Sequence, residues 1–275
     1  MRRLQQSPLR LHLRALVAVI VMALALHVAP LAAQIAVVGN TVEEHTAAPG
    51  QRYEGSIVIH NQTAQPQPVR VYQTDYTFFA DGTSHFDSAG SVRRSNARWI
   101  TPAASGLVVP PSGDVTLTYV VTVPAGDTIQ GTYWSAVMIE GAASAPPVAH
   151  NREVALGAVV RYAVQLATHL RESGSRKVAL SRQTLTSDST GARALTLDVQ
   201  NVGERGYRPR LWVELYDADA NLRAKVEQQR GLLYPGSSLR QRFQFEKLPP
   251  GSYKAVVFAD TGDDAVFASQ YKLTF

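Results

Sequence analysis

The stretch Val154–Leu166 has the sequence Val-Ala-Leu-Gly-Ala-Val-Val-Arg-Tyr-Ala-Val-Gln-Leu, and its alternation decides the fold class. The side chains of one face are all apolar: Leu156, Ala158, Val160, Tyr162, Val164 and Leu166. The other face is nearly as apolar and carries a single charge, Arg161. A strand that is apolar on both faces needs a partner on both. We therefore predict a long strand over Val154–Leu170 that closes an all-β domain.

Period-two patterning continues through the chain from Gln34 onward. The clearest alternating segments are Val115–Val123, Leu195–Val199, Leu211–Leu215 and Tyr253–Val257. Such alternation is typical of half-buried strands, and turn pairs such as Pro49-Gly50, Asp81-Gly82 and Pro235-Gly236 separate the segments. One segment, Arg223–Arg230, is also compatible with a short helix. The pattern predicts an all-β protein of two immunoglobulin-like β-sandwich domains in tandem.

Composition along the chain predicts where these domains begin and end. Residues 1–33 form a signal peptide, and residues 34–170 form the first sandwich. The polar segment 171–177, with a Ser-Gly-Ser core, is the linker, and residues 178–275 form the second sandwich. Ala142–Asn151 contains Pro-Pro and is expected to be an exposed loop of the first domain. Because the linker is short, we expect the two domains to lie close together.

The first 33 residues have the three parts of a secretory signal. Four arginines precede the apolar run Ala15–Leu26, and Leu31-Ala32-Ala33 offers small residues for cleavage. The alternative is an uncleaved membrane anchor, although the run is shorter than the roughly 20 residues of a spanning helix. Without this segment the chain has 23 basic and 22 acidic residues. We therefore expect an exported protein of the periplasm or cell envelope that binds no nucleic acid.

The remaining composition argues against an enzyme. The chain has no cysteine, so thiol nucleophiles, thiolate metal sites and disulfides are excluded. No pair of histidines is spaced for zinc on one element, and no cofactor is expected. Asp217, Asp219 and Asn221 have the spacing that begins a calcium loop, but Leu222 stands where glycine is needed, which favours a hairpin turn.

Several segments of the first domain occur in the order found in a known family. They are Trp99–Pro102, Leu107–Gly113, Gly131–Glu140 and the long strand Val154–Leu170. With the two all-β domains and the short linker, this order resembles periplasmic pilus-assembly chaperones. The first domain is also similar to the N-terminal sandwich domains of bacterial cell-surface proteins. The second domain matches only as a generic immunoglobulin-like sandwich.

The resemblance implies a function in which the long strand is lent to an incomplete sandwich of a secreted subunit. The implied donor residues are Leu156, Ala158, Val160, Tyr162 and Val164. The alternative is that this segment is an ordinary inner strand of its own domain. The resemblance also makes Arg161 the candidate anchor for the terminal carboxylate of the subunit, or else the partner of Glu140 or Glu153 in an ion pair. The family has a further basic residue on its first strand, whereas Gln34–Thr46 has none.

The sequence therefore predicts a non-enzymatic, chaperone-like factor whose partner is a secreted protein subunit with an exposed strand edge. The alternative is an adhesion module of the cell envelope that binds a glycan or a protein through aromatic side chains. The aromatic cluster that motivates this alternative is Tyr72, Tyr76, Phe78, Phe79 and Phe86.

Overall fold

The computed structural model describes residues 34–126, 128–141, 159–187, 192–245, 248–263 and 266–274. The regular secondary structure of these residues is β-strand, apart from one short 3-10 helix, η1 (Ala97–Trp99). The predicted signal peptide and the predicted loop Ala142–Asn151 lie outside the described residues, as do Leu156 and Ala158 of the predicted donor face. No described helix is both long enough and apolar enough to span a membrane.

The first module, residues 35–170, is a sandwich of two sheets. One sheet has the order β1 (Ile35–Val38), β3 (Arg52–Asn61), β8 (Asp114–Thr122) and β6 (Ile100–Pro102). The other has the order β2 (Val42–Ala47), β10 (Arg161–Leu170), β9 (Gly131–Gly141), β4 (Gln67–Phe78) and β5 (Ser84–Ser88), and β7 (Gly106–Val109) pairs with β4. The alternating apolar side chains of both sheets fill the space between them, including Ile59, Val121, Ile139, Val164 and Leu166.

The second module, residues 178–274, is a smaller sandwich. Its sheets are β11 (Val178–Ser187), β12 (Arg193–Asn201) and β15 (Ser238–Phe245), and β14 (Leu222–Gln229), β13 (Arg210–Tyr216), β16 (Ser252–Asp260) and β17 (Val266–Thr274). The Tyr253 hydroxyl donates to the carbonyl of Pro249 over 2.9 Å, the arrangement of a tyrosine corner. The prediction of tandem immunoglobulin-like sandwiches is confirmed.

The segment compatible with a short helix, Arg223–Arg230, is instead part of strand β14. Ala224 and Val226 alternate with exposed neighbours and pack against the core of the second module. Pairing with β13 satisfies the main chain of this segment, so tertiary context overrides a local helical preference.

The N-terminal strand of the first module changes sheets. β1 pairs antiparallel with β3 in one sheet, and a few residues later β2 pairs parallel with β10 in the other. Gly39 lies between the two strands at φ +100°, a conformation that side chains other than glycine rarely adopt. The change of sheet means that β2 covers only Gln165–Leu170 of β10.

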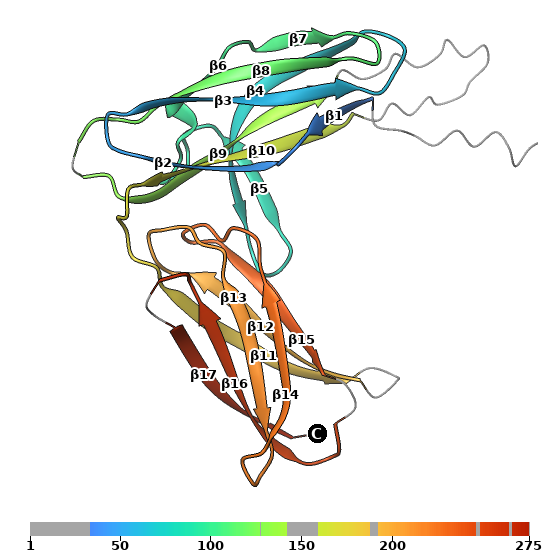
Figure 1. The fold of residues 1–275 in the computed structure, drawn as a ribbon, viewed down its shortest axis with the longest axis vertical. Coiled ribbons are helices and arrows are strands. Elements are labelled where there is room, and N and C mark those ends of the chain that lie inside the picture. The colour runs from blue at the N-terminus through green and yellow to red at the C-terminus, as the bar shows by residue number, and fades with distance from the viewer. Residues whose placement is uncertain are drawn as a thin grey trace, which may run out of the picture.

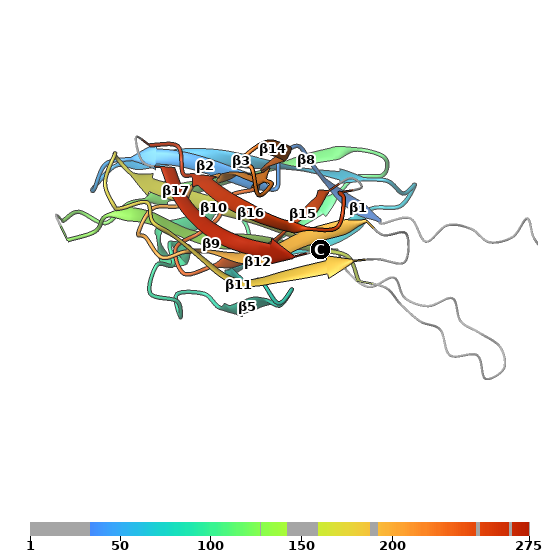
Figure 2. The same ribbon diagram turned by 90° about the horizontal axis from the view of Figure 1, so that it is seen from below.

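The two modules form an elbow. Figure 1 shows the first module lying across one end of the second, with β5 extending beside the second module, and Figure 2 shows the same arrangement from below. The turn after β4 is attached to the second module, because the main-chain N–H of Ala80 donates to the Ser238 hydroxyl over 3.0 Å.

Asp75 of β4 is the most heavily bonded buried carboxylate side chain of the first module. It is 1% exposed and accepts the N–H groups of Gly90 (3.2 Å) and Val92 (2.7 Å). It also accepts the hydroxyls of Ser91 and Ser95. This single side chain therefore holds the segment 90–95 against β4.

We expect Asp75→Ala to lower the free energy of unfolding by about 3 kcal/mol, because it removes a buried acceptor that four partly buried hydrogen bonds share. Urea denaturation of the purified protein measures this. Asp87 lies directly opposite on β5 but is exposed, so Asp87→Ala is the matched control and should change stability by less than about 0.5 kcal/mol. Equal effects of the two substitutions would contradict the role given to Asp75.

Candidate open strand edge and the elbow beside it

The first four residues of β10 have a strand neighbour on one side only. Arg161–Val164 pair with Val137–Glu140 of β9. On the other side, β2 begins its pairing at Gln165, whose N–H donates to the carbonyl of Thr41 over 2.8 Å. Within the part of the chain that the structure describes, no strand covers the far side of Arg161–Val164.

The hydrogen-bond pattern identifies which main-chain groups this edge presents. The carbonyl of Val160 accepts the N–H of Gly141 over 3.1 Å, so even-numbered residues of this strand bond toward β9. Bonding alternates along an antiparallel pair, and Gln165 already bonds toward β2. The N–H and C=O groups of Arg161 and Ala163 therefore point outward from the open edge. Unpaired strand groups of this kind are a template for pairing with another chain.

The side chains of the predicted donor face point into the first module where they are described. Val164 is fully buried in its core, and Tyr162 packs against that core and donates its hydroxyl to the carbonyl of Ile35 over 3.1 Å. Val160 is half-buried and precedes β10. β10 is thus a core strand by its side chains and an open edge by part of its main chain.

Arg161 lies on the opposite face and forms an ion pair with Glu140. Its Nε is 2.6 Å from Glu140 Oε2, so one of the two acids expected as partners is the one found; the other, Glu153, lies outside the described residues. The Tyr72 hydroxyl donates to the same carboxylate over 2.8 Å, and the Arg70 guanidinium lies 4.5 Å from the Tyr72 ring centre. The hydrogen bond from Tyr72, with the charges of Arg161 and Arg70, holds the pKa of Glu140 below its usual value.

This face of the sheet forms the inner wall of the elbow. Trp134 of β9 stacks on Tyr234 of the second module, with ring centres 4.6 Å apart and planes 3° apart. Tyr234 also donates its hydroxyl to the Gln165 side chain over 2.9 Å. Tyr76 and Phe86 pair across β4 and β5 with ring centres 5.0 Å apart. Phe86 is 48% exposed, so the aromatic surface continues outward from the buried stack.

Three members of the predicted aromatic cluster are in contact with one another. Tyr76 contacts both Phe86 and Phe78, with ring centres 5.0 and 5.7 Å apart, and Phe78 meets the edge of Tyr234 at 6.2 Å. Tyr72 belongs to the ion-pair cluster around Glu140. Phe79 is 39% exposed and contacts His85 at the turn.

Besides the Trp134–Tyr234 stack, a series of polar contacts connects the two modules. Arg208 of the second module bonds Glu44 Oε1 through two nitrogens, at 3.0 and 2.5 Å. Glu44 Oε2 lies 3.1 Å from His169 Nε2, whose Nδ1 lies 2.7 Å from the Thr132 hydroxyl. The N–H of Gly206 in turn donates to that hydroxyl over 2.8 Å. These contacts connect β2, β10 and β9 to one loop of the second module.

The linker, this loop and the start of β9 approach one another so closely that three glycines are required. A Cβ on Gly203 would lie 2.3 Å from the carbonyl oxygen of Ser175. A Cβ on Gly131 would lie 2.1 Å from the carbonyl oxygen of Glu204, and one on Gly174 would lie 2.5 Å from Cα of Gly131. The buried Arg205 side chain donates to the carbonyls of Arg171 and Ser173. These elbow residues were not predicted from the sequence, because their partners are far apart in the chain and leave no local pattern.

No group of three or more histidine, aspartate or glutamate side chains suited to a metal occurs in the described ranges. Asp217, which begins the calcium-like spacing, accepts the N–H groups of Asp219 (3.0 Å) and Asn221 (2.9 Å). This is a hairpin turn between β13 and β14.

Several solved structures of fimbrial chaperones are similar to this chain in fold. A class 5 fimbriae chaperone, CfaA, matches with a TM-score of 0.45 and 9% identity over 86% of this chain and 98% of its own. The E. coli chaperone DraB gives 0.41 and 13% over 87% and 95%. A Salmonella enterica SafA pilin–SafB chaperone complex gives 0.41 and 12% over 89% and 99%. At these values the matches do not assign a function. No family model matches the sequence, and no curated protein matches it either.

We expect Glu44→Gln to lower the free energy of unfolding by about 1 kcal/mol at pH 7, because it removes the charge shared by His169 and Arg208. The hydrogen bond from His169 and the Arg208 guanidinium hold the pKa of Glu44 below 4.5, against partial burial, which raises it. A carboxyl with a lowered folded-state pKa stabilises above its unfolded pKa and loses that contribution as the pH falls. The difference between wild type and Glu44→Gln should therefore shrink below pH 4.5.

Calorimetric unfolding at pH 7 and at pH 3.5 measures this difference. The control is Glu54→Gln, because Glu54 pairs with Arg52 while both side chains are more than 60% exposed. A deficit of Glu44→Gln that is equally large at both pH values would contradict the charge-based explanation.

Proposed function

We propose that the protein is a non-enzymatic, chaperone-like factor that holds a secreted subunit by strand pairing along the open edge of β10. The observation that carries this proposal is the outward set of main-chain groups at Arg161 and Ala163. An extended segment of a partner that pairs with this edge can form main-chain hydrogen bonds with these outward groups. The edge lies where β1 and β2 change sheets, so it is a consequence of the fold.

The apolar alternation N-terminal to Arg161 supports strand donation to the partner. Leu156 and Ala158 continue the face of Val160, Tyr162 and Val164 in sequence. We propose that the earlier residues of this face enter the partner, whereas Val164 stays in the core of its own module. Each large side chain buried in a partner contributes about 1.5–3 kcal/mol.

Arg161 remains our candidate for holding a carboxylate of the partner. The Glu140 carboxylate neutralises only one of the two guanidinium groups at this position, because Arg70 lies beside the same cluster. A carboxylate that approaches the open edge therefore meets two guanidinium groups and one acid. Arginine suits this task through bidentate hydrogen bonding.

The aromatic wall of the elbow supports the same use. Tyr76 and Phe86 lie on the sheet face that continues from Trp134, and the exposed part of Phe86 offers apolar contact to a protein held at the edge. The fixed angle of the elbow lets the second module limit where that partner can lie.

The substitution Ala163→Pro tests strand pairing most directly. Proline removes only the outward N–H of this residue and leaves the bonds of Tyr162 and Val164 to β9 in place. We expect the tagged protein, purified from the envelope of its own cells, to co-purify with a secreted β-rich subunit at a one-to-one molar ratio. The variant Ala163→Pro should carry at least about tenfold less.

Ala163→Val keeps the N–H and is the matched control, so it should retain the partner. Circular dichroism and the unfolding midpoint verify that both variants are folded. Undiminished partner recovery by folded Ala163→Pro would refute pairing at this edge. Retention on isolated cell-envelope polysaccharide, lost in Phe86→Ala and kept in Ala163→Pro, would favour the adhesion alternative.

A further inference from the structure

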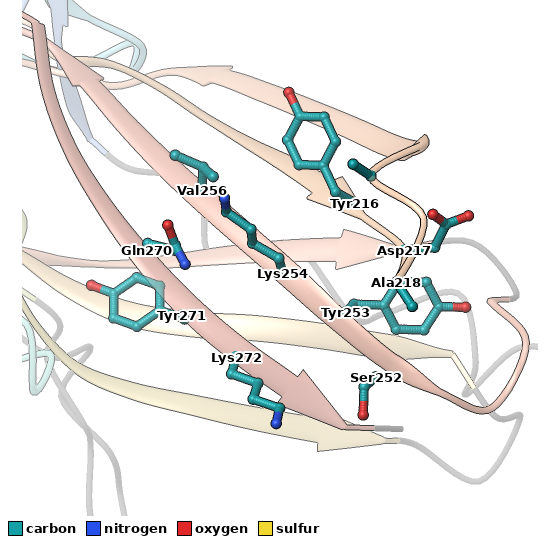
Figure 3. Close-up of a pocket in the computed structure, with 11 residues that line it drawn as sticks. Tyr216, Asp217, Ala218, Ser252, Tyr253, Lys254, Val256, Gln270, Tyr271 and Lys272 are labelled. Atoms are coloured by element: carbon teal, nitrogen blue, oxygen red, sulfur yellow. The ribbon is translucent and has the colours of Figure 1, made fainter.

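The outer face of the second module contains a groove that the elbow does not use. It has a volume of about 590 Å³ and crosses β13, β16 and β17 near their ends. Tyr216, Lys254 and Lys272 come from these three strands, and the turn 217–220 closes one end (Figure 3). This volume lies within the range of ligand-binding clefts.

The groove has an excess of positive charge. Lys254 and Lys272 are direct cross-strand partners, an arrangement that is destabilising for like charges. Figure 3 shows their side chains extending in different directions over the sheet. Among the described residues, no acidic side chain forms an ion pair with either lysine.

The neighbouring acids are occupied elsewhere. Asp217 is held in its turn by the main-chain N–H groups of Asp219 and Asn221 and lies 3.7 Å from Arg223. Glu214 lies 3.1 Å from Lys225 and accepts the Tyr216 hydroxyl over 2.7 Å. The two lysines are therefore left to an external anion.

The rest of the lining selects the kind of anion. Val256 and Gln270 form the next outward-facing cross-strand pair beside the lysines, and Ala218 and Ala220 line the end of the groove. The Tyr216 hydroxyl is already committed to Glu214. The Gln270 amide can hydrogen-bond to the main chain of an extended peptide, and the aliphatic and tyrosine side chains that line the groove offer it apolar contact.

We propose that this groove binds an extended acidic peptide segment of a partner protein, with one carboxylate on each lysine. Alternate residues of an extended chain project to the same side about 7 Å apart. Two acids separated by one residue can therefore face both lysines, while the side chain between them points away from the groove. This second site is independent of the edge of β10, because it lies on the far module and uses side-chain charge.

The test uses the full-length mature protein and the blocked peptide Gly-Glu-Leu-Glu-Gly, with Gly-Gln-Leu-Gln-Gly as the neutral control. Titration calorimetry should detect binding of the acidic peptide alone, and the binding should weaken as salt is raised. The double variant Lys254→Gln, Lys272→Gln should weaken it about tenfold or more. The variant Lys177→Gln, Arg242→Gln removes the same charge from the linker and from β15, away from the groove, and should bind as wild type.

Protection from acetylation gives a second readout without any substitution. The acidic peptide should slow the acetylation of Lys254 and Lys272 in wild type, and leave Lys225 unchanged. The proposal is overturned if the acidic peptide does not bind, or if both double variants bind it equally. It is also overturned if oligogalacturonate binds through the same lysines more tightly than the peptide. Ala163→Pro should leave peptide binding intact, so failure of the strand-edge proposal is distinguishable from failure of this one.

Discussion

The open edge of β10 depends on one constraint, the change of sheet by the N-terminal strand at Gly39. A buried strand must satisfy its main-chain groups on both sides. β2 does this for Gln165–Leu170, and β1 is committed to β3 in the other sheet. The groups of Arg161 and Ala163 are consequently left facing outward, in a strand whose side chains are already fixed in the core. Because Tyr162 and Val164 are held in the core, the strand is already ordered for the proposed pairing, which lowers its entropic cost.

The elbow adds a second rigid element to this edge. Trp134 stacked on Tyr234 anchors the modules through apolar contact, and Arg208 bound to Glu44 anchors them through charge. Both contacts start from the sheet that contains β10. In the proposed complex, a partner paired with that strand faces the inner wall of the elbow in a limited set of orientations.

Sequence patterning predicted the fold because alternation is a local signal that a sandwich imposes on every strand. Leu195–Val199 and Leu211–Leu215 alternate as expected and are buried as expected. The short-helix alternative at Arg223–Arg230 was wrong because β13 supplied a partner that no local pattern reveals.

The roles of Glu44 and Arg208 could not be predicted, since 164 residues separate them. Arg161 was recognisable as the one charge in an apolar strand, and its partner Glu140 was one of two expected acids. Whether the edge is open depended on where β2 begins to pair, which alternation does not encode.

Amide hydrogen exchange of β10 in the free protein tests the central claim most directly. Arg161 and Ala163 should exchange at least about a hundredfold faster than Tyr162 and Val164, because only the latter donate to β9. The N–H of Gln165, which bonds to Thr41, should be protected like its even-numbered neighbours. Uniform protection from Arg161 through Gln165 would mean that a strand already covers this edge, and would contradict the account.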